Sequence, residues 1–411
     1  MTARSIRPRR LLLDLRTPIL AGLASLATLP ALALDVPATK VQIEASLAQN
    51  YPQLDALFKA LHSHPGLGFQ EAATAARPAA QMRVFGFEVT EAVGKTGLVA
   101  VYGNGAGPKV PVSTGLDTLP IAEKTGVPCA GRARATWNGT ETAAAHSCGN
   151  DIHMASWVGT AQALVVMKAQ WRGTLMFIAQ PSEKTVTGAQ AMLNDGVFAS
   201  FGQPDLGFAL HLGSAPAGAV SYQAGVISSN SDVLDIIFVG RGGRAGHGSS
   251  PSLTIDPVRM AARMVVGVQG VVSRDKDAAQ FGVVTIGAIH GGSAGNLIPD
   301  SVQLRGTARS YSPEVRFSNP SNAVVNDVAL TECTAEVFRA ALWGKAKPQS
   351  APGSASEDHA KFIIVGVPSV FFGIGGSDPV IHAQLRAADK PVAANHSPFF
   401  APAPNPVSAP A

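Results

Sequence analysis

The chain has 411 residues, of which 46% are hydrophobic and 15% charged, and it carries 42 Gly and 29 Pro. This composition excludes a disordered or fibrous protein and predicts a globular one of two or three domains with many turns. The formal net charge is +4, but residues 1–33 hold five Arg and one Asp, so the rest has 27 basic and 27 acidic residues. A near-neutral chain gives no indication of nucleic-acid binding.

Residues 1–33 have the pattern of a secretory signal peptide. Four arginines at positions 4–10 precede an apolar run over 18–29, and Ala31-Leu32-Ala33 is a small-x-small cleavage pattern. The alternative is a membrane anchor, but the run is shorter than the roughly 20 residues of a span and Pro30 interrupts it. We therefore predict a periplasmic or secreted protein with no membrane partner.

Helices and strands alternate in the first half of the chain. Apolar spacing predicts helices over 42–63, 71–85 and 151–169, and β-rich runs predict strands at 87–89, 98–102, 110–112 and 173–179. This order indicates an α/β domain with a mostly parallel sheet. In such sheets, ligands bind beyond the carboxyl ends of the strands.

The pattern changes after about residue 229. A strand at 234–239, a helix over 257–272 and strands at 282–289 and 302–308 follow in the order β-α-β-β. This order predicts a small inserted ferredoxin-like α+β domain over 229–325. A helix over 326–342 and a buried strand over 362–373 return to the first domain, which we place at 38–228 and 326–400.

The segment Ser147–His153 has the residue types of a metal site. Cys148 and Asn150 flank a glycine, so both side chains can turn toward one ion. A thiolate is a good zinc ligand, whereas Asn150 offers only a neutral amide oxygen. His153 lies on the first turn of the next helix, where a packing or capping role is the alternative. The chain has two further cysteines, an odd total that leaves at least one thiol free or metal-bound.

Glu183 directly follows a predicted strand, where a carboxylate can act as a general base. Lys184 beside it is unfavourable for a metal, because a cation ~4 Å from a divalent ion is repelled by roughly 8 kcal/mol at an effective dielectric near 20. Either Lys184 points away or one metal position is lost. The alternative for the pair is an ordinary solvated loop.

Other candidates are weaker when taken singly. His211 ends the apolar run 206–210 and His396 follows the last β-rich region, but either could be a structural histidine. His247 lies in the glycine-rich stretch 242–248, which lacks the Walker lysine pattern of a phosphate site. Asn296 caps a strand and has a simple turn role as its alternative.

In this order, the fragments resemble the aminoacylase-like metallopeptidases of family M20, in the branch of hippurate hydrolase and indole-acetyl-amino-acid hydrolases. The resemblance covers about residues 62–400. Its motifs are His64–Glu71, Leu116–Ile121, Asp151–Ala155, Gln180–Glu183, Gly246–Ser249, Ile255–Pro257, Asn296–Asp300, Ser356–Asp358 and Asn395–Phe399.

The resemblance implies a two-metal amidohydrolase in which metal-bound water attacks the amide carbonyl of a small-molecule N-acyl amino acid. It implies roles for individual residues: Cys148, His211 and His396 as metal ligands, Glu183 as general base, Asp117 as an acidic residue near the site, His247 at the oxyanion and Asn296 facing the substrate. It also implies a lid domain that forms a homodimer.

The chain departs from the family pattern at the metal site and in the lid. Asn150 stands where the family has His, and Lys184 stands where it has a second Glu. The lid lacks about one helix and an edge strand after Ser312–Arg316, and Gly243–Ala245 is an insertion. We therefore predict fewer than two manganese or zinc ions per chain. The alternative function is a catalytically impaired homologue that keeps the fold and a small-molecule cleft.

Overall fold

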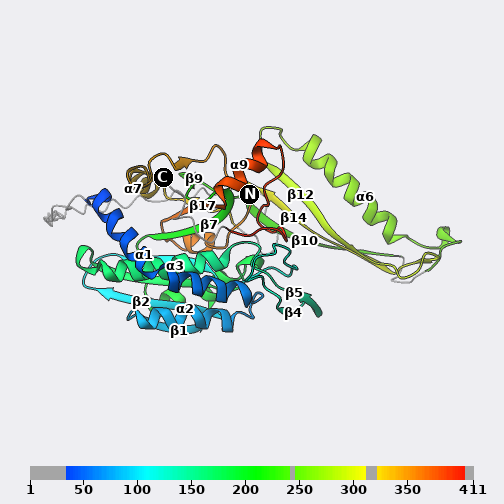
Figure 1. Ribbon diagram of the computed structural model, residues 1–411. Coiled ribbons are helices and arrows are strands. Elements are labelled where there is room, and N and C mark those ends of the chain that lie inside the picture. The colour runs from blue at the N-terminus through cyan, green and yellow to red at the C-terminus, as the bar shows by residue number, and fades with distance from the viewer. Residues whose placement is uncertain (1–33, 241–245, 312–321, 403–411) are drawn as a thin grey trace, which may run out of the picture. The chain divides into compact units, whose positions relative to one another are not determined.

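The computed structural model describes residues 34–240, 246–311 and 322–402, and its largest element is an eight-stranded sheet (Figure 1). The strand order is β1-β2-β6-β3-β7-β17-β8-β16. The bounds are β1 Glu88–Val93, β2 Gly97–Asn104, β3 Lys109–Gly115, β6 Gly173–Gln180, β7 Gly207–Pro216, β8 Val220–Tyr222, β16 Ala346–Pro348 and β17 Ser369–Ser377. The central strands β6, β3, β7 and β17 are mutually parallel, which confirms the predicted mostly parallel α/β sheet.

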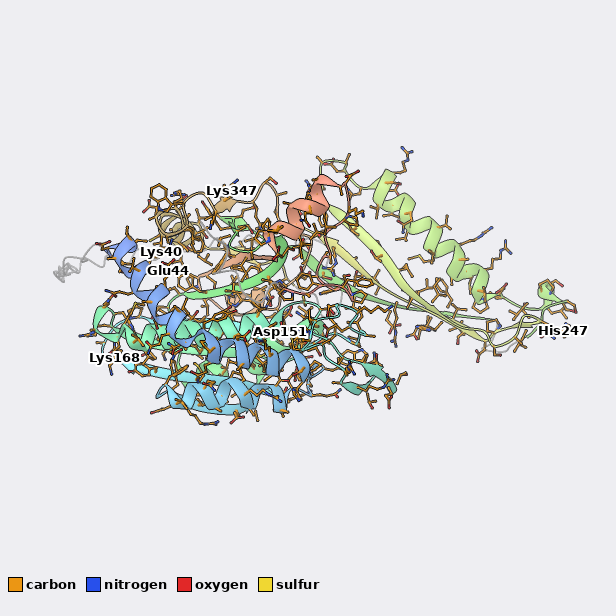
Figure 2. All side chains as sticks on the ribbon, in the orientation of Figure 1. Lys40, Glu44, Asp151, Lys168, His247 and Lys347 are labelled. Atoms are coloured by element: carbon orange, nitrogen blue, oxygen red, sulfur yellow. The ribbon has the colours of Figure 1, made fainter. Side chains whose placement is uncertain are left out.

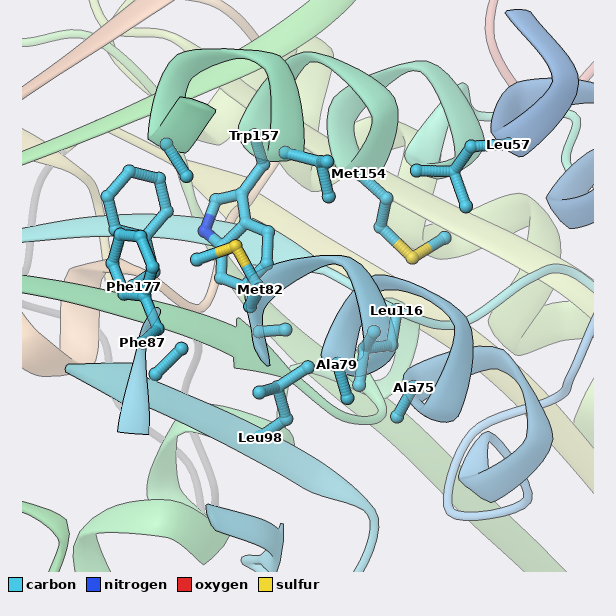
Figure 3. Close-up of a cluster of buried hydrophobic side chains, with 14 of the residues drawn as sticks. Leu57, Ala75, Ala79, Met82, Phe87, Leu98, Leu116, Met154, Trp157 and Phe177 are labelled. Carbon is cyan, nitrogen blue, oxygen red and sulfur yellow. The ribbon is translucent and has the colours of Figure 1, made fainter. Parts of the chain in front are cut away.

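Helices cover both faces of this sheet because its central strands carry apolar side chains in alternation. In β6, Phe177 points to a cluster with α1 (Val36–Ser63), α2 (Ala72–Val84) and α3 (Asn150–Val166). Figure 3 shows this cluster, in which Trp157 and Met82 pack near Phe177. On the opposite face, Ile178 packs with α4 (Gly188–Asn194), α5 (Val197–Phe201) and α8 (Ala360–Ile364). The alternation places the sheet between two helical layers.

A second sheet has three antiparallel strands in the order β10-β14-β12. The strands are β10 (Asn230–Val239), β12 (Gly282–His290) and β14 (Ser301–Ser310), and α6 (Pro257–Gly270) packs on one face. Ala261 of α6 is buried against Val302 and Leu304. Asp256 caps α6 by accepting hydrogen bonds from the backbone of Val258 and Arg259. The β-α-β-β order is the predicted one; the segments of the predicted deletion and insertion lie outside the described residues.

The observed elements differ from the predicted ones at two places: one predicted strand is partly a helix, and one hairpin was not predicted. The strand predicted over 362–373 is a short helix, α8, followed by β17 from Ser369, because Gly366 with a φ of +94° and Pro368 separate the two. The sequence reading also missed the hairpin of β4 (Arg134–Trp137) and β5 (Thr140–Ala143). Asn138 and Gly139 at its turn both have positive φ, as an Asn-Gly hairpin turn requires.

Six further helices and strands are short or lie outside the two main sheets. They are β9 (Gly225–Val226), β11 (Gly246–His247), β13 (Leu297–Ile298), β15 (Val325–Asn326), α7 (Val328–Leu342) and α9 (Pro379–Ala387). Within the part of the chain that the structure describes, none of the helices combines the length and the apolarity that a membrane crossing requires. The predicted signal peptide lies outside the described residues.

Candidate metal and hydrolase site

The candidate residues come from four separate segments that meet at the carboxyl ends of the parallel strands. Asp117 follows β3, Glu183 follows β6, His211 lies within β7, and Cys148 precedes α3. Cys148, Glu183 and His211 line a cavity of about 1090 Å³ together with His396, whereas Asp117 is not among the lining residues. The topology therefore gathers residues that are up to 279 positions apart in the chain.

Cys148, His211 and His396 form the first half of the site, which we call the sulfur–imidazole group. The Cys148 Sγ lies 3.4 Å from His211 Nε2 and 3.2 Å from His396 Nε2. His211 Nδ1 lies 2.7 Å from the carbonyl oxygen of Leu212, which can only accept, so this nitrogen carries a proton. The other ring nitrogen of His211 is thereby directed at the sulfur, as in metal sites where a second contact fixes the imidazole.

Close backbone packing positions Cys148. Gly149, at the start of α3, has a φ of +92°, and a Cβ there would lie 2.7 Å from a methyl carbon of Leu212. Asn395 donates hydrogen bonds from Nδ2 to the carbonyl oxygens of Leu212 (2.9 Å) and Cys148 (3.1 Å). This amide therefore joins the loop of His396 to the segments of the other two members.

The sulfur–imidazole group is electrostatically self-balanced. Burial alone would raise the pKa of the Cys148 thiol, but the positive charges of Lys184 and His211 outweigh burial and hold that pKa well below its usual value. Burial opposes protonation of His211, yet the neighbouring Cys148 raises the pKa of this imidazole to about 9. Each group thus favours the charged form of the other, the thiolate of Cys148 and the imidazolium of His211.

Glu183, Lys184, Asn150 and Asp117 form the second half, which we call the lysine–amide group. Lys184 Nζ donates hydrogen bonds to Glu183 Oε2 and, over 3.2 Å, to Asn150 Oδ1. Asn150 Nδ2 donates to the backbone oxygen of Asp117 at 2.9 Å. Asp117 Oδ2 accepts a hydrogen bond of 2.9 Å from the backbone nitrogen of Lys184. Lys184 therefore points into the site and not away from it.

Burial and charge act against each other throughout this group. Burial opposes the charge on Lys184, but Cys148, Glu183 and Asp117 raise the pKa of its ammonium well above the usual value. Burial would raise the pKa of Glu183, yet Lys184 and His211 lower it overall. For Asp117, burial dominates and raises the pKa well above its usual value.

A second buried cluster supports the start of α3. His62 Nδ1 lies 2.6 Å from Asp151 Oδ2, and His62 Nε2 lies 3.1 Å from Glu123 Oε1. Burial opposes protonation of His62, but Asp151 and Glu123 raise its pKa to about 9. His153 is also structural, because its Nε2 accepts a hydrogen bond of 2.8 Å from the backbone of Leu212. These contacts fix the turn that presents Cys148 and Asn150.

The two lid candidates lie together but do not line the cavity. The backbone nitrogen of Gly248, next to His247, donates a 2.8 Å hydrogen bond to the carbonyl oxygen of Asn296. Figure 2 shows His247 on the segment that carries β11. Both side chains are exposed, and neither is among the residues around the cavity. Within this chain, His247 and Asn296 therefore do not lie where they could contact a substrate in the cavity, and their predicted roles stay predictions.

The cavity is also lined by charged residues for which no role was predicted from the sequence. Glu357 is buried in its wall, where burial and the charge of Glu183 raise its pKa well above the usual value. Arg309 donates from Nη1 to the backbone oxygen of Ser354 (3.1 Å) and to Ser356 Oγ (3.2 Å). Glu357 belongs to the motif Ser356–Asp358, so the resemblance pointed to its segment but not to its place in the cavity.

Comparison with known proteins identifies the family. The model of peptidase family M20/M25/M40 matches residues 113–395, more than half of the chain, and the chain belongs to this family. It is 34% identical to an N-acetylcysteine deacetylase of Bacillus subtilis over 64% of this chain and 66% of that one. It is 31% identical to a probable hydrolase of Synechocystis over 83% of this chain and 93% of that one. It is 34% identical to hippurate hydrolase of Campylobacter jejuni over 62% of this chain and 64% of that one. The matched part thus spans slightly less than two thirds of the deacetylase and of hippurate hydrolase.

Solved structures agree with this family relation. A candidate aminohydrolase from methicillin resistant Staphylococcus aureus superposes with a TM-score of 0.70 at 26% identity, covering 89% of this chain and 95% of that one. A dinuclear metal binding M20 peptidase of Bacillus subtilis superposes with a TM-score of 0.62, covering 87% and 94%. At 24% identity this second likeness shows the fold alone. The words "dinuclear metal binding" describe that Bacillus subtilis protein.

The side chains of this chain fit one ion by donor type but do not fit two. In residues 34–240, 246–311 and 322–402, no group of three or more His, Cys, Asp or Glu side chains is already gathered as a ligand set. Cys148, His211 and His396 nevertheless supply a sulfur and two imidazoles, donors that suit zinc. The lysine–amide group also holds the carboxyl groups of Glu183 and Asp117, but it places the ammonium of Lys184 beside them and the neutral amide of Asn150 next to it. An ammonium in this position repels a divalent ion.

Proposed function

We propose that this chain hydrolyses the amide bond of small N-acyl amino acids or similar small amides. The observation that carries the proposal is the buried carboxylate of Glu183, which lines the same cavity as Cys148 and His211 at the carboxyl ends of parallel strands. The names of relatives support the substrate class, since an N-acetylcysteine deacetylase and a hippurate hydrolase both act on N-acyl amino acids.

Glu183 is the general base in this proposal. Its carboxylate accepts a proton from the attacking water and returns it to the leaving amine. A single zinc or manganese ion would be held by Cys148, His211 and His396, and when bound it polarises the substrate carbonyl as a Lewis acid. Lys184 keeps Glu183 ionised but also lowers its pKa, which makes the carboxylate a weaker base. We therefore expect slow turnover.

We also propose the surroundings in which this activity operates. The chain is exported to the periplasm or secreted, its catalytic domain comprises 38–228 and 326–400, and residues 229–325 form a lid that pairs two chains. Because His247 and Asn296 are exposed and absent from the cavity of their own chain, a dimer could bring them to the substrate of the partner. Size measurement of the purified protein in solution tests the pairing.

A second function is favoured by one specific contact, the ion pair between Glu183 and Lys184. A base that is already bound to an ammonium is poorly available for a substrate's water. In this second proposal the chain is a catalytically impaired homologue that binds a small amide in the cavity without cleaving it.

A substrate screen with matched variants distinguishes the two functions. The purified protein is incubated with hippurate, N-acetylcysteine and other N-acyl amino acids in the presence of manganese, zinc or cobalt, and bound metal is quantified. The first proposal expects turnover that falls at least about 100-fold in Glu183→Gln, and metal binding that is lost in Cys148→Ser. Binding without turnover supports the second proposal. A chain that neither binds nor cleaves any of these amides contradicts both.

A further inference from the structure

We infer that the ammonium of Lys184 replaces one metal ion, and that Asn150 and Lys184 form a single coupled replacement rather than two separate losses. The geometry is direct, because Lys184 Nζ is hydrogen-bonded both to Glu183 Oε2 and to Asn150 Oδ1. The two positions that depart from the family pattern thus bind each other. This inference concerns the resting site and does not depend on the proposed hydrolysis.

The charge of the buried site is the first argument. The Lys184 and Glu183 side chains are each 7% exposed, so their charges must be balanced locally. A divalent ion with one carboxylate ligand carries a net charge of about +1, and so does one lysine ammonium at neutral pH. If Lys184 stands in place of one divalent ion and one carboxylate ligand, the charge of about +1 next to Glu183 is unchanged. A metal ion bound beside Lys184 would add positive charge to a site that is already balanced.

The hydrogen-bonding capacity of Asn150 is the second argument. Its Oδ1 accepts from Lys184 while its Nδ2 donates to the backbone oxygen of Asp117, so both ends of the amide are used. Little space remains, since a Cβ on Gly115 would lie 2.8 Å from Asn150 Nδ2. A larger imidazole at position 150 would compete with the Lys184 side chain for this volume.

The backbone around Lys184 is the third argument. Ser182 and Val186, on either side of the turn Glu183–Thr185, both have positive φ, at 46° and 57°. Asp117 Oδ2 holds the backbone nitrogen of Lys184 at 2.9 Å, and the nitrogen of Val186 donates to Glu183 O at 2.7 Å. The tightly held turn directs the lysine inward, whereas an accidental surface lysine would be free to reach solvent.

Metal content and thermal stability test the inference without relying on activity. Four proteins are compared: the natural chain, Asn150→His, Lys184→Glu and the double variant, each in chelator and with added zinc or manganese. The natural chain is expected to stay folded in chelator and to bind at most about one ion. Lys184→Glu is expected to melt at a lower temperature in chelator, because it adds a carboxylate beside Glu183. The double variant is expected to bind about one ion more and to gain more in melting temperature from metal than the natural chain does.

Additional variants cover the case in which Lys184→Glu fails to fold and supply a matched control. If Lys184→Glu does not fold, Lys184→Arg and Lys184→Gln replace it, and the charge-retaining arginine should preserve melting temperature better than the neutral glutamine. Lys168→Glu, at an exposed lysine labelled in Figure 2, is the matched control and should leave metal content unchanged. Two bound ions in the natural chain would overturn the inference. So would a double variant that takes up no more metal than the natural chain.

Discussion

The two halves of the site balance their buried charges by different means. In the sulfur–imidazole group, the thiolate of Cys148 is balanced by a proton on His211, whose pKa is about 9. In the lysine–amide group, the carboxylate of Glu183 is balanced by the ammonium of Lys184. A proton can leave when a metal arrives, whereas a covalently attached ammonium cannot. This difference is the reason for our proposal that one half accepts an ion and the other does not.

The largest loss in the free energy of unfolding is expected from removing the ammonium of Lys184. Lys184→Met keeps most of the side-chain volume but leaves Glu183 buried without its partner. We expect a loss of about 3–5 kcal/mol in the free energy of unfolding at pH 7, the usual result of breaking a buried ion pair. Urea unfolding of the natural chain and the variant measures the difference.

Lys168→Met is the matched control for this measurement. Lys168 is exposed and makes no salt bridge in the described part of the chain, so the change should stay within about 0.5 kcal/mol. Equal stability of Lys184→Met and Lys168→Met would show that the ammonium does not balance Glu183.

The buried cluster of His62, Asp151 and Glu123 is expected to make the free energy of unfolding depend on pH. Asp151 and Glu123 raise the pKa of His62 from 6.5 to about 9 against the opposing effect of burial. Because the folded pKa is the higher one, the stabilisation of about 3 kcal/mol is complete below pH 6.5 and is lost as pH rises through 9. The difference in unfolding free energy between the natural chain and His62→Gln should therefore shrink between pH 7 and pH 10.

An exposed histidine controls for general effects of pH. His64 lies two residues away and is exposed, so His64→Gln should change the free energy of unfolding by only about 0.5 kcal/mol or less. A pH-independent loss in His62→Gln would mean that His62 acts through packing rather than through its charge.

The exchangeable proton of the sulfur–imidazole group predicts that metal affinity depends on pH. Metal binding must displace the proton from His211, whose pKa is about 9. Below that pKa, each unit of pH should raise the apparent zinc affinity roughly tenfold, equivalent to about 1.4 kcal/mol. Competition with a chelator of known affinity at pH 7 and pH 8 measures the ratio. An affinity independent of pH would place the ion elsewhere.

The sequence predicted much of the main sheet because strands such as β2 and β6 are largely apolar and the helices between them have clear apolar spacing. The order of the motifs also located Cys148, Glu183, His211 and His396, which the structure gathers around one cavity. The hairpin at Asn138-Gly139 was predictable from its turn residues and was overlooked.

The direction of Lys184 could not be predicted from the sequence. It depends on the positive φ of Ser182 and on the hydrogen bond from the Lys184 backbone to Asp117, which is 67 residues away in the chain. The His62–Asp151 contact has the same character, since it joins residues 89 positions apart. The first contact follows from the pairing of β3 with β6 and the second from the packing of α1 on α3, and no local pattern encodes either.

The smallest effect on the free energy of unfolding is expected from Asn395, whose amide links the members of the sulfur–imidazole group. Asn395→Ala removes two hydrogen bonds, to the carbonyl oxygens of Leu212 and Cys148, and should lower the free energy of unfolding by about 1–2 kcal/mol. Because this amide anchors the loop of His396, zinc affinity should fall as well, whereas the lysine–amide group should be unaffected. Ser397→Ala changes the next turn of the same loop without touching Cys148 and is the control. A loss of stability with unchanged zinc affinity would show that the Asn395 amide does not position His396 for the ion, and that the backbone hydrogen bond from His396 to Ser147 suffices.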